Sequence, residues 1–220
     1  TKPWALAKDE AKKEELESVM NHLANTIYTA SVLLSPFLTE GTKKVARCFY
    51  ALEQKRADRK RYPAVNPIDS YSKYIEYPEF EEYIKTKIEG DWIGMVNQMK
   101  TLLLRGKEVQ EQINILGDDG VPVDYHVTFW KSEVIDFVIL QQDAFDKIDA
   151  VCPLERQEFM LKLVMDICNA DYEFETFLDV MDYFKRIINI CKQMNYCEFH
   201  SDKFEEHLGK LKELLAEREA

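Results

Sequence analysis

The feature that most constrains the fold is the spacing of apolar residues, which recur every three or four positions along much of the chain. The segment from Phe174 to Met194 is the strongest case, because its apolar residues cover more than one face of the expected helix. A half-buried strand needs an alternating pattern, and none extends beyond a few residues. Only 7 Gly and 7 Pro leave little of the chain for turns. The sequence therefore predicts an all-α fold.

Prolines, glycines and capping residues divide the chain into separate helices. Pro36 ends a first helix, which begins after Asp9, and Gly117 to Pro122 forms the clearest loop. The expected helices cover residues 10–34, 40–61, 69–74, 78–88, 91–116, 124–142, 153–170, 174–194 and 202–220. This order predicts a helical hairpin joined through a continuous helix to a multi-helix bundle.

The joining helix begins at Thr39, a fair N-cap, and continues to Arg61 before the Tyr62-Pro63 stop. Its last two turns, from Lys55 to Arg61, are strongly basic and form the only candidate polyanion patch. Cations at a helix C-terminus complement the helix dipole and can pair with acidic side chains. We favour this ion-paired interpretation over a nucleic-acid site, since a short patch is a weak footprint in an acidic chain.

The formal net charge of -11 and the pI near 5.0 argue against a general nucleic-acid or anionic-membrane binder. This charge is unevenly distributed. Residues 1–44 carry equal numbers of basic and acidic side chains, so the whole excess lies in residues 45–220. The shift indicates a boundary near residue 45.

Five cysteines, an odd number, are scattered through apolar helical patterns, which is typical of reduced, buried thiols in a cytoplasmic protein. No apolar run is long enough to span a membrane, so we expect no membrane insertion. The chain begins at Thr1 without a methionine, which we interpret as the start of an excised segment.

Motifs for catalysis, cofactors or metals are missing from the sequence. The glycines have neither the G-x-x-x-x-G-K-[ST] nor the G-x-G-x-x-G spacing of phosphate-binding loops. Cys191, Cys197, His200 and His207 are the only candidate zinc ligands, and their intervals fit no ligand pattern. We expect no catalytic residue, no metal and no cofactor.

Two segments resemble known families. TKPWALAKD and LLSPFLTE, within residues 1–45, resemble the anticodon-binding helical bundle of methionyl-tRNA synthetases. That resemblance implies that Pro3 and Trp4 help to stack an anticodon base and that tRNA is a partner. The family's polar base-reading residues and its catalytic domain have no counterpart in the chain.

Residues 46–220 are similar to the C-terminal helical domain of the catalytic subunit of V-type and archaeal-type rotary ATPases. The motifs are RYPAVNPIDSYS and LQQDAFD, in which Pro67 replaces a usual Trp and Asp143 a usual Asn. In the family this domain closes over the adenine side of the nucleotide and pushes against the rotor stalk, beside neighbouring ATPase subunits. The resemblance places four residues near the adenine pocket: Gln141, Gln142, Ala144 and Phe145. Phe145 is then either a stacking surface or an ordinary loop or core aromatic.

Our leading hypothesis is a non-catalytic, engineered fusion of the two families, with domains 1–45 and 46–220 sharing the helix 39–61. The first alternative is a natural fragment of the V-type ATP synthase catalytic subunit, whose parent couples ATP hydrolysis or synthesis to proton or sodium transport. The second is a tRNA-binding module that uses Trp4 and the basic run. An active ATPase is the function that the sequence supports least, because the phosphate loop is missing.

Overall fold

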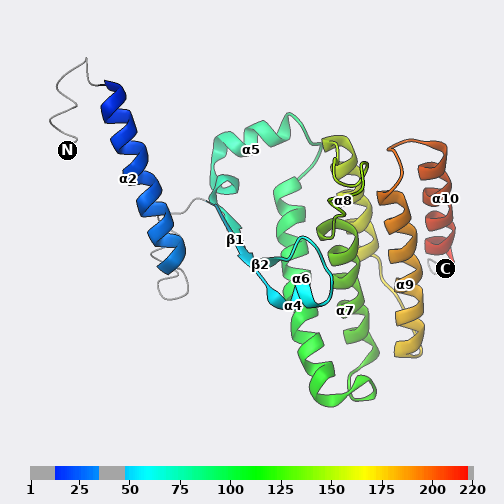
Figure 1. The fold of residues 1–220 in the computed structure, drawn as a ribbon. Coiled ribbons are helices and arrows are strands. Elements are labelled where there is room, and N and C mark those ends of the chain that lie inside the picture. The colour runs from blue at the N-terminus through cyan, green and yellow to red at the C-terminus, as the bar shows by residue number, and fades with distance from the viewer. Residues whose placement is uncertain (1–12, 35–47, 218–220) are drawn as a thin grey trace. The chain divides into compact units, whose positions relative to one another are not determined.

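The computed structural model describes residues 13–34 and 48–217. The chain divides into two compact units, unit 1 (Thr1–Phe49 with Ser72–Tyr74) and unit 2 (Tyr50–Tyr71 with Ile75–Ala220). The described part of unit 1 consists mainly of helix α2 (Lys13–Leu34), which ends where the predicted Pro36 stop requires (Figure 1). All the functional geometry discussed below lies in unit 2.

The predicted helix 39–61 is wrong from residue 48 onward. Residues Cys48–Leu52 form strand β1, which pairs with β2 (Val65–Ser72) in a two-stranded sheet. In β1 exposure alternates: Tyr50 and Leu52 are exposed, whereas Ala51 between them is half-buried and donates its N–H to Ser70 Oγ at 3.0 Å. Over five residues the apolar spacing fits both a helix and a strand, and pairing with the distant strand β2 decided in favour of the strand.

Only a short helix, α4 (Gln54–Asp58), follows β1. The Lys60 N–H donates to Ala57 O at 2.9 Å, and the φ of 57° at Lys60 turns the chain back at the end of the helix. The Arg61 N–H then donates to Arg56 O at 2.9 Å, and the chain leaves toward β2 at the Tyr62-Pro63 stop. The basic run therefore surrounds the end of a short helix and does not finish a long one.

The remaining helices follow the apolar spacing of the sequence and confirm the all-α class. Their bounds are η2 (Lys73–Glu76), α5 (Pro78–Lys85), α6 (Trp92–Leu116), η3 (Asp118–Gly120), α7 (Val123–Ile135), the π turn η4 (Asp136–Leu140), α8 (Leu154–Asn169), α9 (Phe177–Asn195) and α10 (Asp202–Ala216). Asp91 and Ser201 cap α6 and α10, accepting the N–H groups of Gly94 and Phe204. The predicted helix 69–74 is the end of β2 followed by η2.

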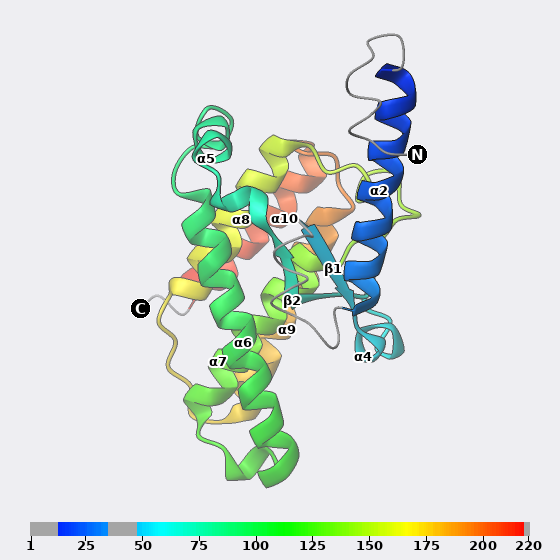
Figure 2. The ribbon, with the colours of Figure 1, turned by 90° about the vertical axis from the view of Figure 1, so that its left-hand side faces the viewer.

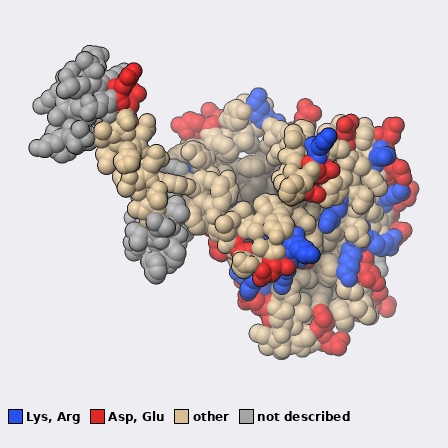
Figure 3. Space-filling model, in the orientation of Figure 1, with Lys and Arg blue, Asp and Glu red and all other residues tan. Residues whose placement is uncertain are grey.

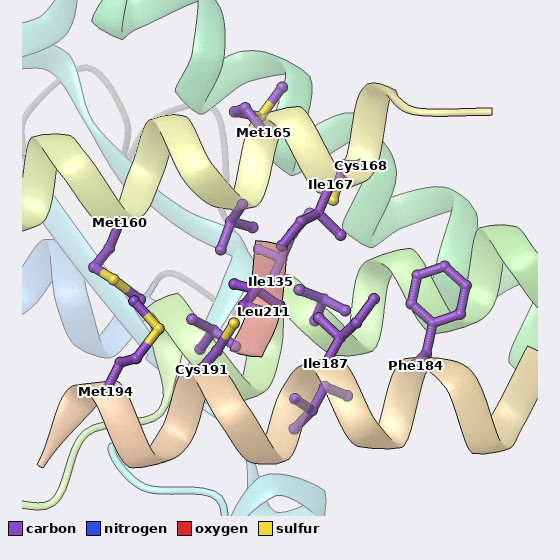
Figure 4. Close-up of a cluster of buried hydrophobic side chains, with 14 of the residues drawn as sticks. Ile135, Met160, Met165, Ile167, Cys168, Phe184, Ile187, Cys191, Met194 and Leu211 are labelled. Carbon is purple, nitrogen blue, oxygen red and sulfur yellow. The ribbon is translucent and has the colours of Figure 1, made fainter. Parts of the chain in front are cut away.

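Within unit 2, α6 and α7 form a long antiparallel hairpin, and α9 lies between α7 and α10 (Figures 1 and 2). Helix α9 contributes many of the buried core residues on one broad side, but its opposite side is exposed and not covered as the sequence predicted. Phe184, Ile187, Cys191 and Met194 of this helix are fully buried. They face apolar side chains of α7, α8 and α10, including Leu211 (Figure 4). This packing gives the hairpin and its following loop a rigid support.

Candidate functional site

The site begins where α7 changes its hydrogen bonding. In the π turn η4, the Gln141 N–H donates to Asp136 O at 2.9 Å, five residues back instead of four. The next residue, Gln142, leaves the helix and donates its N–H to Tyr62 O at 2.9 Å. The loop after α7 is thereby attached to the segment that follows α4.

Aspartate side chains fix the shape of the loop. Asp143 Oδ1 accepts the Phe145 N–H at 2.9 Å, and Asp146 Oδ1 accepts the N–H groups of Ile148 and Asp149, each at 2.8 Å. Asp149 Oδ2 in turn accepts the Asp143 N–H at 2.6 Å, which closes the loop on itself. Such bonds to the backbone are typical of tight, ordered turns.

These bonds also set the protonation of the carboxyl groups. The backbone N–H groups of Asp149 and Ile148 lower the pKa of Asp146 below its ordinary value. Burial raises the pKa of Asp149 despite its bond from the Asp143 N–H. The loop thus holds one stabilised carboxylate and one that is partly desolvated.

Phe145 stands at the exposed end of this loop, with 99% of its surface accessible. This exposure excludes the core aromatic, while the stacking surface and the ordinary loop aromatic both stay as predictions. Exposing a whole phenyl ring on a rigid turn gains nothing for folding. Single exposed apolar residues are common on protein surfaces, so the exposure alone assigns no function, but it leaves the ring face free for a ligand.

All four residues that the sequence placed together do line one cavity, of about 530 Å³: Gln141, Gln142, Ala144 and Phe145. A cavity of this volume suits a small organic ligand. Gln141 Oε1 is buried and has no hydrogen-bond partner within the described part of the chain. Because this oxygen is buried, a ligand that carries an N–H or O–H group can reach it only after neighbouring side chains shift.

The sequence did not identify the other lining residues. Tyr62, Phe137 and Tyr196 add aromatic surface, and Lys60 and Lys192 add positive charge opposite Asp143 and Asp149. The pKa of Tyr196 is raised, first by burial and then by these acidic neighbours, so its hydroxyl stays protonated. These residues come from three distant segments, and only the Tyr62-Pro63 stop was visible as a signal in the sequence.

The basic run contributes a separate ion-pair network. Arg56 Nη1 donates to Asp136 Oδ1 at 2.6 Å, and Arg61 contacts the second oxygen of Asp136. Arg61 also forms two bonds with Glu133, at 2.6 and 2.9 Å. For these two arginines the predicted ion pairing is confirmed.

The candidate zinc ligands do not come together. Cys191 is fully buried in the core, and burial raises its pKa to about 12. His200 is exposed and pairs with Glu205 at 3.1 Å, from Nδ1 to Oε1. Within residues 13–34 and 48–217, no group of three or more His, Cys, Asp or Glu side chains is arranged to hold a metal ion.

Pro3, Trp4 and the junction near residue 45 lie outside the described residues. Among the described helices, none combines the length and apolar character needed to span a membrane. Basic and acidic side chains are interspersed on the face shown in Figure 3.

Comparison with known proteins shows what the helical part is similar to. Residues 81–173 match the family described as the C-terminal domain of V and A type ATP synthase. The V-type ATP synthase alpha chain of Protochlamydia amoebophila is 31% identical over 181 residues, which is 82% of this chain and 30% of that one. The corresponding chain of Borrelia duttonii is 33% identical over 178 residues, 81% of this chain and 29% of that one. The chain thus spans less than a third of the length of these relatives.

A solved structure with a lower likeness is the ATP synthase subunit NeqB from Nanoarcheaum equitans. It has a TM-score of 0.44 and 14% sequence identity, and it covers 59% of this chain and 30% of that one.

These matches support one of the two resemblances seen in the sequence, that to the C-terminal domain of the V/A-type ATP synthase subunit. None of them is to a methionyl-tRNA synthetase, and neither the synthetase segment nor an engineered fusion has support. Residues 46–220 number 175, so the match of 181 residues includes at least six from residues 1–45. The shared helix on which the fusion hypothesis depended is interrupted by β1. The alternative of a natural ATP synthase segment fits these findings.

Proposed function

We propose that the helical part of this chain is a non-catalytic coupling domain of a V- or A-type ATP synthase alpha subunit. The relatives reported above are V-type ATP synthase alpha chains. The glycine spacing of a phosphate-binding P-loop is missing from this sequence. In this proposal the phosphates of the nucleotide bind to another domain. The loop from Gln141 to Asp149 covers the adenine, and we place the boundary of this coupling domain near residue 45.

The observation that carries the proposal is the exposed Phe145 ring beside the cavity of about 530 Å³. A purine needs a flat apolar surface for its face and a few polar groups for its edge. Phe145 supplies the surface. Gln141 Oε1 is an unpartnered but buried acceptor, which neighbouring side chains must uncover before it accepts from an amino group such as that of adenine.

The fold also gives the loop a means of transmitting movement. Helix α7 and the π turn η4 run without interruption from Val123 to Leu140, and the loop follows at once. At about 1.5 Å per residue this rod is roughly 25 Å long. Its other end is the tip of the α6–α7 hairpin, where Ile115 and Leu116 are exposed (Figure 1). We propose this tip, where Ile115 and Leu116 lie beside the exposed Asp118 and Asp119, as the surface that contacts the rotor stalk.

Adenosine titration of the full chain tests the nucleotide-facing part. We expect the amide signals of the loop to shift on adenosine with weak, roughly millimolar affinity, because the phosphate contacts lie elsewhere. Phe145→Ala should abolish the shift and Phe145→Tyr should retain it.

Val151→Ala is the matched control, since Val151 is also exposed but does not line this cavity. A parent chain whose loop signals ignore adenosine, or a Phe145→Ala variant that binds as the parent does, would contradict the proposal.

A further inference from the structure

The ion-pair network of the basic run leaves one part of Arg56 unused. Arg56 Nη1 bonds to Asp136, but within the described residues Nε and Nη2 have no hydrogen-bond partner. The side chain is only 9% exposed, so water does not compensate these two donors. Leaving buried, charged donors unpaired is costly.

Nε and Nη2 form the same edge of the planar guanidinium group. This is an edge that binds a carboxylate or a phosphate group through two parallel hydrogen bonds. Arg61 uses both of its Nη atoms on Glu133, whereas the Nε–Nη2 edge of Arg56 has no acid opposite it. The unpaired donors of Arg56 therefore have the geometry that an oxyanion requires.

Arg56 lines a cavity of about 180 Å³ between α4, β2, α6 and α7. Its walls carry five cationic side chains against four acidic ones: Lys55, Arg56, Arg59, Arg61 and Lys107 against Glu53, Glu111, Glu133 and Asp136. Since Arg56 and Arg61 pair with Asp136 and Glu133, the walls keep a positive excess in a chain whose net charge is -11. The local charge thus favours an anion against the charge of the whole protein.

We propose that the Nε–Nη2 edge of Arg56 and the cavity beside it form a binding site for a small oxyanion, a phosphate group or a carboxylate. Both nitrogen atoms are buried, so binding requires the side chains that cover them to shift. Lys55 and Lys107 are exposed at the cavity wall and can follow the anion. This site is separate from the cavity lined by Phe145 and does not depend on the function proposed for it.

Titration with inorganic phosphate and with acetate tests this site, with chloride at the same ionic strength as the reference. The readout is the NMR signal of the Arg56 Nε–H group, identified by its loss in Arg56→Lys. We expect a saturable shift with roughly millimolar affinity. A response to phosphate alone assigns a phosphate group, whereas a response to both assigns carboxylates as well. A shift that chloride reproduces would overturn the proposal.

Variants separate the site from general surface charge. Arg56→Lys keeps the charge but lacks the two-donor edge, so the affinity for phosphate should fall about tenfold or more. The amide NMR signals of α6 and of the segment after α4 report this affinity in the variants. Lys107→Ala should weaken it by a smaller factor and remains informative if Arg56→Lys unfolds. Arg105→Ala is the matched control, because Arg105 is an exposed cation of α6 that does not line the cavity. Equal effects of Lys107→Ala and Arg105→Ala would refute a specific site.

Discussion

The substitution Gly106→Ala tests a close contact between α6 and α7. A Cβ atom on Gly106 would lie 1.9 Å from Ser132 Oγ and 2.3 Å from Ser132 Cβ. Rotation of the Ser132 side chain moves Oγ but leaves Cβ in place, so the two helices themselves must separate. Ordinary carbon contacts are about 3.5–4.0 Å, and the required separation is therefore more than an ångström.

Overpacking of this kind costs about 3 kcal/mol, at the upper end of its usual range. The better helix propensity of alanine offsets about 1 kcal/mol. The free energy of unfolding should thus fall by about 2 kcal/mol, which for a chain of this size lowers Tm by roughly 4–8 °C. Urea unfolding followed by circular dichroism measures the first quantity, and a thermal scan measures the second.

Two further variants make the test specific. In Gly106→Ala/Ser132→Gly the nearest remaining atom of residue 132 is its Cα, at 3.8 Å, so most of the loss should be recovered. Gly209→Ala on α10 has nothing within 4 Å of its new Cβ and should stabilise the protein by about 0.5–1 kcal/mol. If Gly106→Ala is as stable as the parent, the close contact between α6 and α7 is wrong.

Three other predictions follow from buried or hydrogen-bonded groups. Asp136→Ala leaves the Arg56 charge buried without its partner, so the free energy of unfolding measured in urea should fall by about 3–5 kcal/mol. Glu206→Ala removes one member of an exposed pair with Lys210 and should change this free energy little. Equal effects of the two variants would contradict the buried network. Because the pKa of Asp146 is lowered in the folded protein, its hydrogen bonds to the loop are present above the ordinary pKa of an aspartate. They are lost as the pH falls through the folded pKa, and NMR signals of the Ile148 and Asp149 amides should show this loss. Asp146→Asn should keep both amides hydrogen-bonded at every pH. Burial raises the pKa values of Cys168 and Cys191 to about 12, so alkylation at about pH 8 should label neither until the protein unfolds; rapid labelling of either in the folded protein would show that the core is open.

The helices of unit 2 were predictable because their apolar stripes are long. Helix α9 shows this best: its buried residues recur every three or four positions along one broad side, whereas the opposite side, including Leu178, is exposed, so the prediction that its apolar surface covers more than one face went too far. Strand β1 was not predictable, because its five residues fit a helical stripe until β2, more than ten residues later, pairs with them.

The candidate site was likewise only partly predictable from the sequence. Gln141, Gln142, Ala144 and Phe145 are adjacent in the sequence and were found through their motif. Their partners Tyr62 and Tyr196 come from segments more than fifty residues away on either side. The unpaired edge of Arg56 was equally invisible, because the sequence shows a cation but not which of its nitrogen atoms find a partner.

The π turn at the end of α7 determines which way Phe145 points. A π turn contains one residue more than the helical turn it replaces, and one residue of an α-helix corresponds to a rotation of about 100°. If that extra residue had continued the α-helix, the loop after Leu140 would begin about 100° further round; the wider π turn takes up the residue and keeps the loop in the direction set by α7. The gain or loss of one residue at this position can therefore be accommodated by exchanging a π turn for an α turn, with the exposed ring still pointing the same way.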